Sequence, residues 1–146
     1  MQICSDRRHT FSVPPEELWD AMARVDAYRQ WWPWLRGFDA EALAVGERWS
    51  AVVQPPLPYR LRFEVHLDEI RAPHLASAEV SGDIEGRARI EIAPIAGGSE
   101  LHFVSELAPT NAILRAVAQV ASPMVRFGHE WVLDTGLRQF RDRALP

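Results

Sequence analysis

Two short helices placed directly after the first strand constrain the fold of this chain more than any other feature of its sequence. Residues 2–13 alternate between polar and apolar side chains and stop at a proline pair, which predicts a strand. A helix is expected over residues 15–22, because a proline and two acidic residues occupy its first turn. A second short helix is expected from Asp26 to about Trp32, since Pro33 disfavours helical geometry in the residue before it. This order leaves few topologies open.

The segment from Gly37 to Leu107 has a period of two rather than 3.6, which is typical of strands. Its clearest strand runs from Tyr59 to Asp68, where apolar and charged residues alternate, so that one face meets a core and the other meets water. Short turns separate the strands, which predicts an antiparallel meander. The other strands of this meander are expected at residues 38–43, 47–54, 74–80, 84–92 and 101–107.

The remainder of the chain predicts one long helix, which begins after Pro109 and ends at about Arg143. Pro123 is expected to kink this helix, because proline removes one backbone hydrogen bond. At 100° per residue, a set of apolar side chains falls within about 40° of one line, and this stripe is expected to face the sheet. The stripe consists of Ile113, Val117, Val120, Met124, Phe127 and Trp131.

Composition and charge exclude several classes of function. The 146 residues suit one domain over the whole chain, 1–146, and their net charge of −4 argues against a nucleic-acid partner. All 16 basic residues are arginines, so that no lysine is available for Schiff-base chemistry. The single cysteine, Cys4, offers neither an internal disulfide nor a zinc cluster. Neither a signal peptide nor a membrane span is predicted, so we expect a cytoplasmic protein.

The order of one strand, two short helices, six strands and one long helix resembles the START/Bet v 1-like (SRPBCC) superfamily, and within it the bacterial polyketide cyclase/dehydrase-like proteins. The resemblance implies an α+β helix-grip fold, in which a curved antiparallel sheet of about seven strands wraps around the C-terminal helix. It also implies a hollow, apolar interior. The family has no universal catalytic motif to transfer. The residues that carry the resemblance are 11–19, 28–33, 81–86, 97–101 and 129–137.

The apolar stripe of the helix and the inward face of the sheet predict an elongated cavity between them. Small residues on the sheet, among them Ala76, Ala78 and Gly86, would leave space opposite the helix. At least one residue of the Trp31–Trp34 cluster is expected at the cavity rim or on a contact surface. The predicted ligand-binding residues are Trp32, Phe63, Ala88, Phe103, Ser105, Val120, Met124, Phe127 and Trp131.

Five histidines invite a catalytic or metal interpretation, but no pair has the spacing of metal ligands, so that neither a metal nor a cofactor is predicted. His9 is in phase with the inward residues of the first strand, and Arg7 lies two residues before it. A cyclase would need a base and a group that stabilises an enolate, so His9 and Arg7 are the candidate catalytic pair. The alternative is that both residues lie at an exposed strand end and have no function.

Three functions therefore stay open. The first is the binding or carriage of a hydrophobic small molecule, such as a lipid, a quinone or a polyketide-like aromatic. The second is a polyketide cyclase or dehydratase that uses the same pocket. The third is a protein-interaction module that uses the Trp31–Trp34 surface. Whether the protein is an enzyme is left open, and a homodimer is among the assemblies that the sequence allows.

Overall fold

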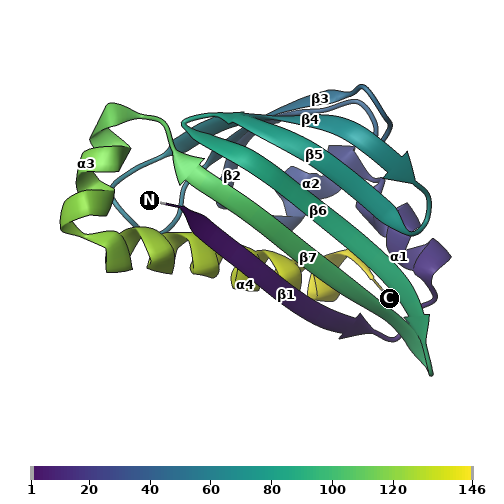
Figure 1. Ribbon diagram of the computed structural model, residues 1–146. Helices are drawn as coiled ribbons and strands as arrows, with labels where there is room; N and C mark the ends of the chain where they lie inside the picture. Colours follow the sequence, from purple (N-terminus) through teal and green to yellow (C-terminus); the bar gives the residue numbers. More distant parts are fainter. Residues whose placement is uncertain (1, 146) are drawn as a thin grey trace.

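A computed structural model describes residues 2–145 and shows a curved sheet with a long helix in its concave face (Figure 1). The elements in chain order are β1 (Ile3–Phe11), α1 (Pro15–Met22), the 3₁₀ turn η1 (Val25–Ala27), α2 (Tyr28–Trp31), β2 (Leu35–Asp39), β3 (Arg48–Val53), β4 (Leu61–Arg71), β5 (Leu75–Gly82), β6 (Ile84–Ile95), β7 (Gly98–Pro109), α3 (Ala112–Val120) and α4 (Ser122–Ala144).

The seven strands form one antiparallel sheet in the order β1-β7-β6-β5-β4-β3-β2. All neighbours are consecutive in the chain except β1 and β7, because β1 closes the meander at its far edge. Helix α4 runs along the concave side, α3 stands across one end of it, and α1 and α2 lie toward the other end (Figure 1). This arrangement is the expected α+β helix-grip fold.

The expected elements before the meander lie close to the observed ones. Helix α1 has the bounds that the proline and acidic residues of its first turn indicated. The second expected helix is divided into η1 and α2, and Trp32 leaves the helix with an extended backbone just before Pro33. The strand predicted at residues 38–43 is wrong at both ends: β2 begins at Leu35, which is buried and pairs with Val53, and it ends at Asp39.

Strand β4 extends past the last residue that alternation predicted. A bulge between Leu67 and Glu69 shifts its register against β5, and the strand then continues to Arg71. A strict period of two would place Ile70 on the outer face of the sheet. The bulge turns its side chain back to the core. Strict alternation therefore ends at Asp68, although the strand does not.

The long C-terminal helix is present as α4, but the prediction that it begins after Pro109 is wrong, because the shorter helix α3 precedes it in a different direction (Figure 1). The break lies at Ala121, whose backbone angles (φ −135°, ψ 52°) are not helical. Pro123 does not kink a helix but lies in the first turn of α4, where its missing N–H costs nothing. No helix of residues 2–145 is long and apolar enough to cross a membrane.

Aromatic residues fill the end of the molecule where α1 and α2 meet the C-terminal part of α4. Phe140 contacts Phe11 and Trp31 edge to face, with ring centroids 5.9 and 5.5 Å apart. Trp31 and Trp34 are buried, and the indole of half-buried Trp32 donates a hydrogen bond to the carbonyl of Gly136. The three indoles of the Trp31–Trp34 cluster are thus mostly core, which leaves little exposed aromatic surface for the interaction-module hypothesis.

Candidate functional site

A cavity of about 240 Å³ lies between the concave face of the sheet and α4. Strands from both halves of the sheet build its wall, and α3 covers one side through Leu114. Nearly all of its lining is apolar, and the polar side chains on it are those of Tyr59 and His129. The principal wall residues are Ile3, Val53, Leu61, Phe63, Val65, Val80, Ile84, Ala88, Phe103, Leu107, Leu114, Val125, Gly128, Val132 and Leu133.

A second cavity, of about 190 Å³, lies further along α4 toward the aromatic end. Phe103, Val132 and Leu133 belong to the walls of both cavities and separate them. The interior therefore consists of two adjoining compartments rather than the one elongated cavity that was predicted. The division lies where Phe103 of β7 and the α4 residues Val132 and Leu133 line both cavities.

The inner face of α4 is marked by small residues. A Cβ atom on Gly128 would lie 2.5 Å from the hydroxyl oxygen of Tyr59, and one on Gly136 would lie 3.1 Å from the ring of Trp34. Glycine inside a helix lowers its stability, so that two glycines on one face indicate a close approach of other groups. This signal is present in the sequence and could have identified the buried face of the helix.

Several predicted binding residues lie where the prediction placed them, although their contact with a ligand stays a prediction. Phe63, Ala88 and Phe103 are on the wall of the first cavity, and Trp32 is on the wall of the second. Ser105 is buried on the same face of β7, between wall residues of that strand and opposite Ala88 on β6.

The predicted lining residues on the helices are misplaced. Val120 is 90% exposed and Phe127 is 52% exposed, so that neither lies inside. Met124 is half-buried but is not on the wall of either cavity. The predicted stripe assumes one continuous helix. Because the helix breaks at Ala121, the residues before and after the break do not share one face. The residues that face the interior instead are Val125, Gly128, His129, Val132, Leu133 and Gly136.

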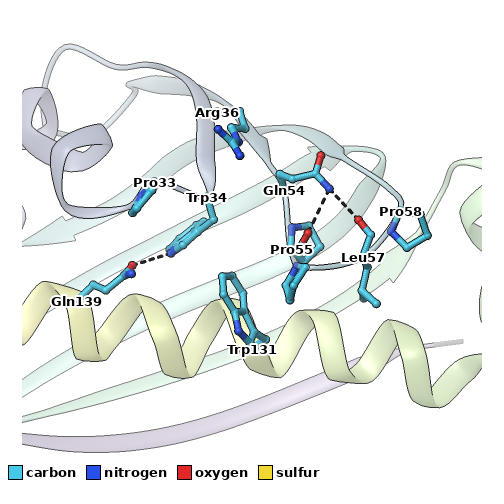
Figure 2. A pocket seen from close by; sticks show the side chains of 10 residues that line it. Pro33, Trp34, Arg36, Gln54, Pro55, Leu57, Pro58, Trp131 and Gln139 are labelled. Carbon is cyan, nitrogen blue, oxygen red and sulfur yellow. Dashed lines mark hydrogen bonds between the residues drawn. The ribbon is translucent and has the colours of Figure 1, made fainter.

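Trp131, also expected inside, lies on an open groove of about 700 Å³ between α4 and the loop after β3 (Figure 2). The indole of Trp34 donates a hydrogen bond to Gln139 across this groove, at 2.9 Å. The amide of Gln54 fixes the loop by donating to the carbonyl oxygens of Pro55 and Leu57. Polar and apolar side chains both line this groove, whereas the lining of the first cavity is nearly all apolar.

Arg7 and His9 point inward from β1 but lie at the rim between this edge strand and α4. The Nε atom of Arg7 lies 3.2 Å from the Oδ1 atom of Asp134, and a second guanidinium nitrogen lies 3.9 Å from Glu130. Burial lowers the pKa of His9, and the charge of Arg141 lowers it further. Neither Arg7 nor His9 is on the wall of the two cavities. Their catalytic role stays a prediction.

The histidine on the cavity wall is His129, which the sequence reasoning missed. Its Nε2 atom lies 2.8 Å from the hydroxyl oxygen of Ser5 on β1. Burial lowers the pKa of His129, as does the nearby Arg7, while Glu130 opposes the shift. The imidazole is therefore neutral near pH 7 and can act as donor and acceptor. Within residues 2–145, no cluster of three or more potential ligands could hold a metal ion.

A curved sheet wrapped around a long helix, with an apolar cavity between them, defines the helix-grip class of proteins. The chain belongs to the family described as polyketide cyclase / dehydrase and lipid transport, whose sequence profile matches residues 2–144. No functionally curated protein matches it in sequence.

Solved structures share the whole fold. The Zhui aromatase/cyclase from a Streptomyces species has a TM-score of 0.80 at 12% identity, with 99% of this chain and 94% of that chain covered. A Thermus thermophilus protein, TTHA0849, has a TM-score of 0.71 at 13% identity, with 99% and 97% covered. Protein CV1439 from Chromobacterium violaceum has a TM-score of 0.69 at 18% identity, with 98% and 97% covered. At these identities the likeness shows the fold alone.

Proposed function

We propose that the whole chain acts as one domain that binds and carries a hydrophobic small molecule in the chamber between the sheet and α4. The observation that carries this proposal is the 240 Å³ cavity, whose wall is apolar except for Tyr59 and His129. When an apolar ligand fills such a cavity, the ligand leaves water and makes van der Waals contacts with the wall. Both changes lower the free energy of the complex. A family description that includes lipid transport supports the same interpretation.

The dimensions of the chamber favour a compact ligand. Typical sites for drug-sized molecules occupy roughly 300–1,000 Å³. The two compartments, of about 240 and 190 Å³, are smaller than that. Among the candidate ligands, a small aromatic or quinone ring, or one end of an acyl chain, suits each compartment. A longer molecule would require the Phe103 side chain to move so that the compartments join.

Native mass spectrometry of the purified protein tests the proposal directly. We expect a fraction of the protein to carry a co-purified apolar molecule. Its added mass should be seen on the folded protein and should be absent after unfolding. The apoprotein should then bind small aromatic and acyl probes in a stoichiometry of one. A protein that carries no adduct and binds none of these probes would contradict the proposal.

A polyketide cyclase or dehydratase is the second candidate, and the histidine on the cavity wall favours it. A cyclase needs a group that exchanges a proton near neutral pH, which a histidine supplies. His9 and His129 are therefore compared as His9→Gln and His129→Gln in the turnover of a poly-β-ketone mimic. Loss of about 10²–10⁴-fold in one variant alone would identify the acid–base residue. Absence of turnover in the wild type would leave only carriage.

A further inference from the structure

Two buried serines stand side by side next to the cavity. Ser5 on β1 pairs directly with Ser105 on β7, so both side chains lie on the concave face of the sheet. The hydroxyl of Ser5 forms a hydrogen bond with the Nε2 atom of His129, at 2.8 Å. Ser105 is only 2% exposed, and its hydroxyl is the buried side-chain group for which residues 2–145 provide no hydrogen-bond partner.

An unpaired buried hydroxyl lowers stability compared with an alanine in the same place. Ser105 lies among cavity-wall residues: Phe103 and Leu107 flank it on the same face of β7, and Ala88 is its partner on β6. Ser105 itself is not on the cavity wall, but these three neighbours are. A ligand oxygen is therefore a partner that could satisfy it.

His129 is the second polar group in this region, because it is on the cavity wall and its Nε2 atom is hydrogen-bonded to Ser5. Its Nδ1 atom is therefore the ring nitrogen without a hydrogen-bond partner among residues 2–145. The ring is neutral near pH 7, because burial disfavours its charged form and lowers its pKa. The nearest cation, Arg7, is paired with Asp134 and Glu130 outside the cavity. Nothing on the cavity wall compensates the charge of an anion.

We propose that His129 and Ser105, with Ser5 orienting the imidazole, bind an uncharged oxygen atom, a ketone carbonyl or a hydroxyl, of an otherwise apolar ligand. This inference rests on the proposed function and narrows its ligand class. It selects neutral ketones, quinones, phenols and alcohols over hydrocarbons, which leave Ser105 unpaired, and over carboxylates, which bring an uncompensated charge inside.

Three probes that share one ring system test this selectivity. An engineered cavity of about 150 Å³ holds benzene, so a cavity of about 240 Å³ admits two fused rings. Calorimetric titration of the wild type with naphthalene, 1-naphthol and 1-naphthoate should give 1-naphthol the highest affinity, roughly tenfold above naphthalene, as one satisfied hydrogen bond implies. The pair of n-decane and 2-decanone repeats the comparison for a straight chain.

Variants then identify which groups bind the oxygen. Ser105→Ala and His129→Leu should each reduce the preference for 1-naphthol over naphthalene to about threefold or less. Tyr59→Phe, which removes a hydroxyl that is on the cavity wall, should preserve the preference. Ser99→Ala serves as the control for a buried serine, because Ser99 is bonded to the carbonyl of Val13 and lies outside the cavity. Circular dichroism verifies that each variant is folded.

The outcomes separate the two proposals. If hydrocarbon and oxygenated probes bind wild type equally, or if Ser105→Ala leaves the preference unchanged, the oxygen site is wrong while ligand carriage stands. Loss of the preference in Tyr59→Phe alone, or binding of 1-naphthoate as tight as that of 1-naphthol, would also overturn it. If no probe of either series binds, the proposed function fails, and the oxygen site fails with it.

Discussion

The inner and outer faces of α3 and α4 differ in a way that hydrophobicity does not reveal. The outer face carries large apolar residues that are exposed, namely Ile113, Val120 and Phe127. The inner face carries two glycines, Gly128 and Gly136, and a histidine among its buried apolar residues. The faces of these helices are thus distinguished by the space that their side chains leave rather than by their apolar character. Small residues allow α4 to approach the sheet at some points and leave the chamber open at others.

Two phenylalanines on opposite faces of α4 give the largest expected contrast. Phe140→Ala removes a buried ring from between Phe11 and Trp31, and should lower the free energy of unfolding by about 3–5 kcal/mol. Phe127→Ala removes an exposed ring and should change it by less than about 1 kcal/mol. Urea unfolding of both variants measures the difference. Equal losses would show that the assigned faces are wrong.

Filling the chamber should affect binding more than stability. Ala88→Leu places a larger side chain on the cavity wall, so we expect at least a tenfold loss of affinity for an apolar probe. Its free energy of unfolding should change by less than about 1.5 kcal/mol, because the added atoms enter space that is already empty. Ala93→Leu, an exposed position on the same strand, is the matched control and should leave both quantities unaltered. Unimpaired binding by Ala88→Leu would place the ligand elsewhere.

Two valines on either side of the break at Ala121 test the assignment of inner and outer faces. Val125 is 5% exposed, and Val125→Ala should lower the free energy of unfolding by about 1–2 kcal/mol through lost burial. Val120 is 90% exposed, and Val120→Ala should raise it by a few tenths of a kcal/mol, because alanine favours the helix. The sign of each change, measured by thermal or urea unfolding, is the test. A destabilised Val120→Ala variant would mean that α3 is oriented differently.

The smallest expected effect is a pH dependence of stability at His129. Burial and Arg7 lower its pKa in the folded state below the usual value of about 6.5. The unfolded chain therefore binds more protons as the pH falls below that value, so that the free energy of unfolding decreases on acidification. The lowered pKa of His9 acts in the same direction.

Urea titrations between about pH 7 and pH 5 should accordingly show a shallower decline for His129→Gln than for the wild type. The double variant with His9→Gln should decline least. Parallel curves for all three proteins would show that neither imidazole is held in its neutral form by the fold.

The sequence predicted those parts of the molecule that depend on local chemistry. A proline and two acids begin α1 at Pro15, and alternation identified the inward residues of β6 and β7 that line the cavity, Ala88 and Phe103 among them. A strand that is buried on one face repeats every two residues whatever it packs against, so that its inner face can be read directly. The helix-grip topology was implied by the family resemblance that the order of such elements carries.

The tertiary structure alone decided which face of the C-terminal helices meets the sheet and which polar groups enter the chamber. A helix can carry two apolar stripes, as α3 does with Leu114 and Ala118 inside and Ile113 and Val120 outside. The choice between them depends on packing and on the break between the helices at Ala121, since Pro123 is compatible with a kink as well as with the first turn of a new helix. His129 and Ser5, 124 residues apart, meet for the same reason: β1 closes the sheet beside α4, a contact that only the folded chain creates.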